Sequence, residues 1–243
     1  MTDNNYPARY WHAEGGRYRC DVCPRACLLS PGQKGFCVVR EGGEQGMVLT
    51  TYGRSSGFCI DPIEKKPLNH FYPGTPILSF GTAGCNLGCK FCQNWDISKA
   101  RADDALQSEA SPAAIARSAV KVGARSVAFT YNDPTIFLEY AIDTAVECKK
   151  LGVHPVAVTN GYIQGDARVD LYANMDAANI DLKAFTEDFY RDVCLAHIEP
   201  VKETLKHVVK STSCWVEITT LLIPGYNDGD AEIEALATWV AKE

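Results

Sequence analysis

Short apolar runs alternate with helix-like segments from Thr75 onward, and this alternation constrains the fold more than any other feature of the sequence. Five apolar runs predict buried strands at residues 76–80, 126–130, 155–159, 178–182 and 215–223. Helical spacing predicts helices at residues 112–122, 134–151, 166–174, 187–193, 201–210 and 231–241. Such a pattern is typical of an α/β fold with a parallel sheet covered by helices on one side. Right-handed crossovers would curl this sheet into a partial or full TIM-like barrel, and a doubly wound open sheet is the alternative.

The first 74 residues differ from the rest of the chain. They are rich in Gly, Pro and Cys and show no helical period, and only residues 47–52 predict a short strand before a Gly/Ser turn. We therefore divide the chain into a small, loop-rich, cysteine-containing N-terminal cap (residues 1–74) and an α/β core (residues 75–243).

Composition excludes several classes of partner. The net charge is −6 and charges of both signs are scattered, so no basic stripe indicates nucleic acid. No apolar run is long enough to cross a bilayer, and residues 1–10 have no signal-peptide core. We expect a cytoplasmic protein that binds neither nucleic acid nor membranes.

Seven of the eleven cysteines fall into two groups, and without an export signal we expect such groups to bind metal rather than form disulfides. The first group has four members: Cys20, Cys23, Cys27 and Cys37. Four thiolates favour a closed site for zinc or a second iron–sulfur cluster, and free or redox-paired thiols are the alternative. The isolated cysteines are interpreted as ordinary buried residues: Cys59, Cys148, Cys194 and Cys214.

The second group follows the first predicted core strand with the spacing C-x3-C-x2-C, at Cys85, Cys89 and Cys92. Gly84 and Gly88 let the backbone bend closely around a metal centre. A [4Fe–4S] cluster usually takes four cysteines, so three leave one iron open, as a catalytic centre requires. A zinc site completed by a remote His or Cys, as in a zinc hydrolase, is the alternative.

This segment, with the aromatic Phe91 before its third cysteine, resembles the signature of the radical S-adenosylmethionine (SAM) superfamily. The resemblance implies that the open iron binds the amino and carboxylate groups of SAM and that Phe91 packs beside the adenine. It further implies an electron donor protein and reductive cleavage of SAM to methionine and a 5′-deoxyadenosyl radical. That radical abstracts hydrogen from a substrate.

Polar residues follow the later strands, where the same resemblance implies contacts with SAM. Asn132 and Asp133 stand where such proteins bind the SAM amino group, although relatives have Glu where this chain has Asp133; an Asx turn and N-cap is an equal alternative. Asn160 is a weaker candidate, because Asn-Gly is also a common turn. Asp181 and Lys183 share one face of a strand, and the resemblance places them near the SAM ribose and carboxylate; a structural ion pair is the alternative.

Three further stretches narrow the resemblance: residues 20–40, 61–68 and 70–74. They are similar to the radical SAM member of the AmmeMemoRadiSam system, which itself is similar to pyruvate formate-lyase-activating enzymes. Relatives carry at least one more strand, so we expect a core truncated at its C-terminus. The substrate is then a glycyl-radical partner protein or a small molecule or peptide, and a non-catalytic metal-binding regulatory or scaffold protein is the alternative.

Overall fold

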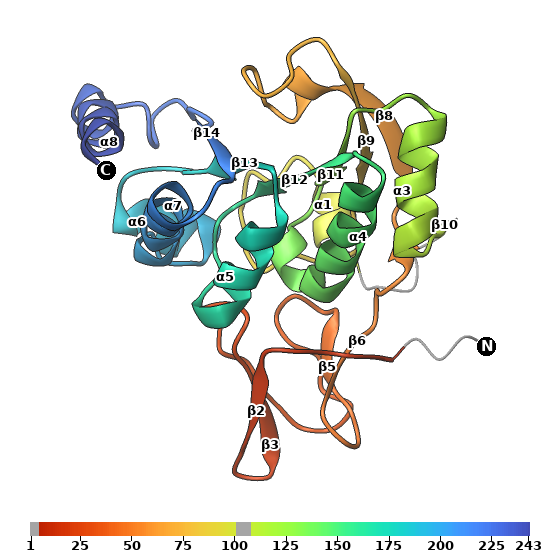
Figure 1. Ribbon diagram of the computed structural model, residues 1–243. Helices are drawn as coiled ribbons and strands as arrows, with labels where there is room; N and C mark the ends of the chain where they lie inside the picture. Colours follow the sequence, from red (N-terminus) through yellow and green to blue (C-terminus); the bar gives the residue numbers. More distant parts are fainter. Residues whose placement is uncertain (1–4, 101–107) are drawn as a thin grey trace.

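The computed structural model describes residues 5–100 and 108–243, and its centre is one six-stranded sheet (Figure 1). The strand order is β14-β13-β12-β11-β9-β8. Five strands run parallel: β9 (Pro76–Phe80), β11 (Ser126–Phe129), β12 (His154–Thr159), β13 (Ala177–Asp181) and β14 (Trp215–Thr219). The predicted parallel α/β core is therefore confirmed, and β14 pairs with no further strand in the described part of the chain.

Helices follow the strands as the apolar spacing predicts. The longer ones are α3 (Pro112–Lys121), α4 (Leu138–Lys150), α5 (Gly165–Asn174), α7 (Glu199–Ser211) and α8 (Asp230–Lys242). Helix α3 contacts β11, α4 contacts β12 and α7 contacts β14. Phe80 packs between Phe129 and Tyr140 of α4, with ring centroids 5.5 Å apart in both pairs, so the strands and helices share one apolar core. No helix in the described ranges is long and apolar enough to cross a membrane.

Three predicted elements end or divide differently. The helix predicted over residues 134–151 is a 3₁₀ helix η2 (Pro134–Phe137) followed by α4. The strand predicted to run to residue 223 ends at Thr219, because buried Asn227 binds the backbone beyond it: its side chain donates to the Leu221 carbonyl and accepts from the Ile223 N–H. The helix predicted over residues 187–193 is a short α6 (Glu187–Phe189) followed by a π-helical turn η3 (Tyr190–Cys194). A π-turn changes the hydrogen-bond pattern without changing the apolar spacing, so the sequence pattern does not reveal it.

The sixth strand, β8 (Phe58–Pro62), was not predicted and comes from the range assigned to the cap. It pairs antiparallel with β9, and the short 3₁₀ helix η1 (Ile63–Lys65) follows it. Residues 63–74 then cross the amino ends of the parallel strands, and we call this segment the floor. Its Ile63 and Leu68 pack on Ile77, Ala128, Val156 and Ala177 of the sheet.

Glu217 of β14 fixes the far end of the floor. Its carboxylate accepts hydrogen bonds from the backbone N–H groups of Asn69, His70 and Phe71 at 2.7, 3.0 and 3.1 Å. The side chain of Asn179 on β13 donates to the carbonyl of Pro67 at 3.0 Å. The floor therefore spans the sheet from β8 to β14, which gives a structural role to the two stretches at residues 61–68 and 70–74.

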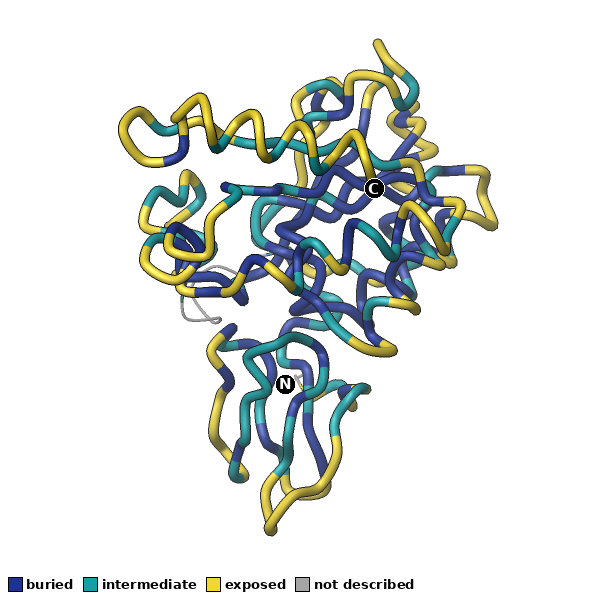
Figure 2. Tube along the Cα trace, turned by 90° about the vertical axis from the view of Figure 1, so that its left-hand side faces the viewer, coloured by how far each residue is buried: buried dark blue, intermediate teal, exposed yellow. Residues whose placement is uncertain are grey.

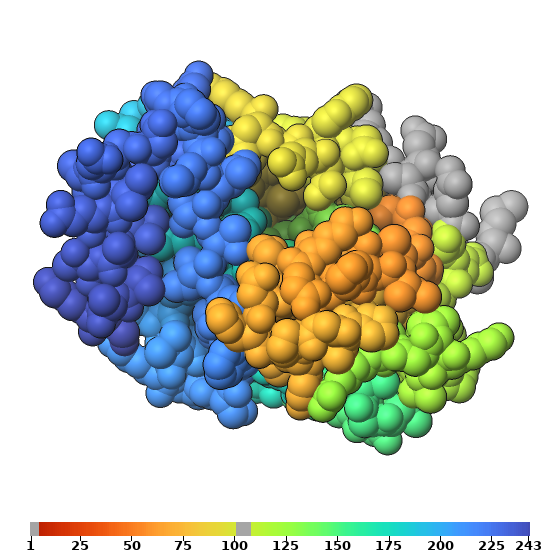
Figure 3. All heavy atoms as spheres, turned by 90° about the horizontal axis from the view of Figure 1, so that it is seen from above, coloured from red at the N-terminus to blue at the C-terminus, as the bar shows by residue number. Residues whose placement is uncertain are grey.

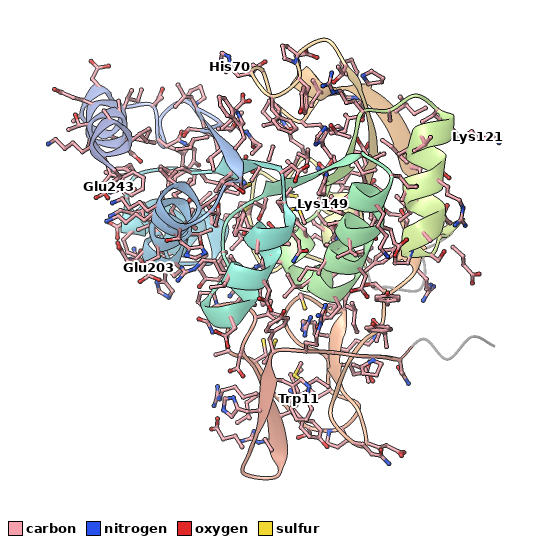
Figure 4. All side chains as sticks on the ribbon, in the orientation of Figure 1. Trp11, His70, Lys121, Lys149, Glu203 and Glu243 are labelled. Atoms are coloured by element: carbon pink, nitrogen blue, oxygen red, sulfur yellow. The ribbon has the colours of Figure 1, made fainter. Side chains whose placement is uncertain are left out.

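The cap contains more strand than the sequence predicts. One three-stranded sheet joins β1 (Tyr6–Pro7), β6 (Met47–Leu49) and β5 (Arg40–Gly42), and another joins β2 (Trp11–Glu14), β3 (Arg17–Cys20) and β4 (Leu28–Leu29). A third pairing links β7 (Arg54–Ser55) with β10 (Ser108–Glu109). The far end of the cap is formed by exposed loops (Figure 2), and Trp11 in the cap lies at the opposite end of the molecule from His70 on the floor (Figure 4).

A buried ion pair joins the cap to the core. Both guanidinium Nη atoms of Arg40 lie 2.9 Å from the carboxylate of Glu139 on α4, and both side chains are almost completely buried. Glu139 also accepts a hydrogen bond from the backbone N–H of Arg9. Because a buried charge without its partner is costly, this pair fixes the position of the cap on the core.

Candidate active site

All nine predicted cluster and SAM contacts line one cavity of about 300 Å³ at the carboxyl ends of the parallel strands. They are Cys85, Cys89, Phe91, Cys92, Asn132, Asp133, Asn160, Asp181 and Lys183. Figure 3 shows a hollow bordered by the segment that carries the three cysteines (yellow), by the segment around β8 (orange) and by the residues after β14 (blue). Ligands bind at this end of parallel α/β sheets, so the strands bring residues from distant parts of the chain to one place.

The segment from Gly84 to Cys92, here called the cysteine loop, is held by backbone contacts on two sides. The N–H groups of Gly88 and Lys90 donate to the carbonyls of Cys194 and Val193, both at 2.9 Å. On the other side Gly84 has φ +82°, and a Cβ there would lie 2.0 Å from the carbonyl oxygen of Cys37. Glycine at position 84 therefore allows a close approach between the loop and the cap.

The three thiols of this loop have different surroundings. Burial raises the pKa of Cys85, whose sulfur lies 3.9 Å from the side-chain nitrogen of Asn160. The Cys89 thiol is in hydrogen-bond contact with Cys194, which together with the charge of Lys183 lowers the pKa of Cys89. The sulfur of Cys92 lies 3.1 Å from the hydroxyl of Ser98.

Asp133 makes the local contacts of an N-cap and also reaches the neighbouring strand. Its carboxylate accepts from the backbone N–H of Thr135 at 2.9 Å, as an Asx turn requires, at the start of the 3₁₀ helix η2 (Pro134–Phe137). It also accepts from the backbone N–H of Asn160 at 2.7 Å and from the hydroxyl of Thr159. Burial raises the pKa of Asp133, and these hydrogen bonds only partly offset that effect.

Two asparagines connect the strand ends to the cysteine loop. Asn160 donates to the side-chain oxygen of Asn86 at 2.9 Å, and Asn86 donates to the carbonyl of Tyr162 at 2.7 Å. Asn132 turns toward the start of the loop, where it donates to the hydroxyl of Thr82 at 3.0 Å and accepts from its N–H at 3.2 Å. Asn132 and Asn160 therefore position the loop in addition to lining the cavity.

Asp181 and Lys183 form an ion pair of 2.7 Å on the cavity wall. Burial lowers the pKa of Lys183, but Asp181 outweighs this effect and the pKa lies above its ordinary value. The Lys183 ammonium also lies 5.9 Å from the ring centroid of Phe91, and Phe91 packs on Phe189 at 5.9 Å. The ion pair that the sequence left as the alternative is therefore present, with the aromatic residue of the cysteine loop beside it, and contact of these charges with SAM stays a prediction.

Sequence reasoning missed several residues that line the cavity or contact its thiols. Tyr131, with φ +71°, and Leu221 line the cavity. Cys194 was interpreted as an ordinary buried residue; it is buried, but it contacts Cys89. A single cysteine far along the chain carries no spacing signal, so nothing in the sequence could have linked it to the loop.

The four cap cysteines line a second, smaller cavity of about 20 Å³. It is also lined by Arg25, Phe36, Arg40 and Asn86. Within residues 5–100 and 108–243, no group of three or more His, Cys, Asp or Glu side chains has the spacing that holds a metal ion, and all eleven cysteines are free thiols. The structure therefore brings the four predicted ligands to one cavity and leaves their metal as a prediction.

Comparison with known proteins supports the same interpretation of the site as its geometry. The model of a family described as the radical SAM superfamily matches residues 80–237. The uncharacterized protein MJ0808 of Methanocaldococcus jannaschii is 39% identical over 234 residues, which are 96% of this chain and 69% of that protein. The pyruvate formate-lyase 1-activating enzyme of Escherichia coli is 23% identical over 164 residues, which are 65% of each chain.

Among solved structures, Streptococcus suis SuiB bound to precursor peptide SuiA is similar with a TM-score of 0.52 at 15% identity. The match covers 67% of this chain and 35% of that chain. At this level of identity the likeness shows the fold alone.

Proposed function

The chain belongs to the radical SAM superfamily, and from this premise we propose that it cleaves SAM reductively at a [4Fe–4S] cluster held by Cys85, Cys89 and Cys92. The observation that carries the proposal is that these three thiols share one cavity with the Asp181–Lys183 ion pair. Three thiolates suit a cluster with one open iron, and the Lys183 ammonium and Asp181 carboxylate in the same cavity suit a ligand that carries a carboxylate and hydroxyl groups.

When bound, the cluster supplies the electron that converts SAM to methionine and a 5′-deoxyadenosyl radical. The protein's own residues position SAM and exclude water from it. Lys183 would receive the SAM carboxylate, Asp181 the ribose hydroxyls, and Phe91 would cover the adenine. Asp133 and Asn160, which are hydrogen-bonded to each other at the ends of neighbouring strands, would bind the SAM amino group. An electron donor protein completes the reaction.

For the substrate we propose a partner protein on which a glycyl radical is formed. The similarity to a pyruvate formate-lyase-activating enzyme supports this choice. A small molecule or peptide is the second candidate, because the cavity of about 300 Å³ has the size of a small-ligand pocket. We also keep the closer assignment to the AmmeMemoRadiSam group, which rests on the cap cysteines and residues 61–68.

Two further parts of the proposal concern the cap and the compartment. We propose that Cys20, Cys23, Cys27 and Cys37 bind a second iron–sulfur cluster or zinc, because all four line one cavity. We also propose a cytoplasmic location, where reducing conditions keep the thiols of both groups available as ligands.

The test is anaerobic reconstitution with iron and sulfide, followed by dithionite and SAM. We expect an oxygen-sensitive cluster and 5′-deoxyadenosine, both lost in Cys89→Ala and both retained in Cys59→Ser, a variant of an exposed cysteine outside the two groups. An intact cluster that yields no 5′-deoxyadenosine would reject the enzyme and favour a metal-binding scaffold. Bound zinc without visible absorbance would favour a hydrolase.

A further inference from the structure

The four-cysteine cavity of the cap contains a buried cation with one unused donor. Arg40 is 2% exposed and lines this cavity. Its two Nη atoms bind Glu139 and the carbonyl of Arg9, while its Nε–H has no hydrogen-bond partner among the described residues. A buried N–H normally finds a partner. Four thiolates around a metal form a negatively charged group, and an N–H beside a metal-bound sulfur is the usual kind of outer contact for such a site.

The backbone next to the cysteines is strained in two places. Ala26, which precedes Cys27, has φ +44°, and Val38, which follows Cys37, has φ +61°. A β-branched residue with positive φ is a true outlier, and such residues persist only where the surrounding structure holds them. Neither residue is a glycine that would adopt this conformation freely. Metal–thiolate bonds at the adjacent cysteines would provide that restraint.

The same loops hold the cysteine loop of the core. Arg25, which lies between Cys23 and Cys27, donates from Nε to the carbonyl of Asn86 at 2.8 Å and from Nη2 to the carbonyl of Leu195. Asn86 directly follows Cys85. Asn86 lines the cap cavity while Cys85 lines the large cavity, so adjacent residues of one loop form a wall of each.

We infer that the cap cavity is a metal site whose occupation clamps the cysteine loop, with Arg25 as the positioning residue that transmits the clamp. The inference rests on the proposed second metal site and adds a role for it. The ligand chemistry is that of a thiolate-preferring metal, either a zinc ion or an iron–sulfur cluster. When the cap metal is lost, the loop between Cys23 and Cys27 relaxes, Arg25 releases its two carbonyls, and the core cluster loses its support.

The first experiment isolates the cap site. The full-length variant Cys85→Ala/Cys89→Ala/Cys92→Ala is purified anaerobically, and its zinc, iron and acid-labile sulfide are measured. About one zinc ion per chain identifies the cap site as a zinc site, and iron with equal sulfide identifies it as an iron–sulfur cluster. Cys23→Ser in the same background should remove that metal. If the triple variant holds neither metal, the inference is overturned.

The second experiment measures the clamp. Cluster loss from the core site is followed by visible absorbance during treatment with a chelator, with the signal of the triple variant subtracted. Arg25→Ala should keep the cap metal but lose the core cluster about tenfold faster, because two hydrogen bonds from a charged donor are removed. Arg17→Ala, at an exposed arginine of the cap, is the matched control.

Equal rates for Arg25→Ala and Arg17→Ala would overturn the clamp. Neither readout requires SAM cleavage, so the two proposals can fail separately. If the wild-type protein makes no 5′-deoxyadenosine while the metal content and chelator rates come out as expected, the proposed activity fails and the clamp stands.

Discussion

Gly84→Ala should damage the cysteine loop more than its single added methyl group suggests. Gly84 has φ +82°, which costs an alanine about 1–2 kcal/mol. The new Cβ would also lie 2.0 Å from the Cys37 carbonyl oxygen, which belongs to backbone and not to a flexible side chain that could turn away. Restoring an ordinary carbon–oxygen contact of about 3.3 Å requires the loop and the cap to separate by about 1.3 Å. The hydrogen bonds of Arg25 to the same region oppose that movement.

The expected cost is about 3 kcal/mol, taken as the conformational term plus a similar term for displaced backbone. For a protein of this size it lowers the melting temperature by about 6–12 °C, and iron retained after reconstitution should fall with it. Differential scanning calorimetry and iron analysis of the same samples measure the two effects.

Gly152→Ala is the matched control, because Gly152 has φ +70° but no described atom lies within 4 Å of the place that the added methyl group would take. That variant should lose only the conformational term, about 1–2 kcal/mol, and bind iron as the wild type does. If the two variants lose equal stability and retain equal iron, the close approach of cap and loop is not what positions the cysteines.

Three other predictions follow from charged groups. Arg40→Met should cost about 3–5 kcal/mol in urea unfolding by leaving Glu139 buried without its partner, and Arg40→Met with Glu139→Leu should recover much of that loss. Burial raises the pKa of Glu217, but hydrogen bonds from the floor backbone outweigh burial and hold the pKa below its ordinary value. Glu217 therefore stabilises the folded state above the unfolded pKa of about 4.3, and this stabilisation is lost as the pH falls through the lower folded pKa. Glu217→Gln should therefore flatten the acid side of a melting-temperature profile. Lys183→Met should weaken SAM binding about tenfold to hundredfold in equilibrium dialysis without removing the cluster, and unchanged binding would exclude the ammonium as a SAM contact.

The core and the membership of the site follow from local patterns in the sequence. Strands such as Pro76–Phe80 are buried apolar runs, and their carboxyl ends must meet at one edge of a parallel sheet. Residues that follow those ends, such as Asn160, therefore come together whatever the loops do in detail. For this reason all the predicted core contacts line one cavity.

The parts that the sequence did not predict depend on long-range contacts between short or irregular segments. Strand β8 is an edge strand that pairs antiparallel with β9, whereas the other strands of the sheet are parallel. Its sequence has no alternation of apolar and polar residues that would distinguish it from a loop. Cys194, the last residue of η3, lies beside Cys89, where its carbonyl accepts a hydrogen bond from the N–H of Gly88. Asn227 stops β14 by binding backbone groups that no pattern marks.

The site is therefore not a property of the superfamily region alone. The family model begins at residue 80, yet the Cys37 carbonyl and the Arg25 side chain that hold the cysteine loop lie before it. The floor, which closes the other end of the sheet, also lies before it and is fixed by Glu217 from the last strand. Because loops gain precision from the rigid elements that support them, the segments outside the matched region decide how closely the three thiols are placed. Variation in the cap should then alter the core cluster more than equal variation on the exposed helix α8, which has no buried residue.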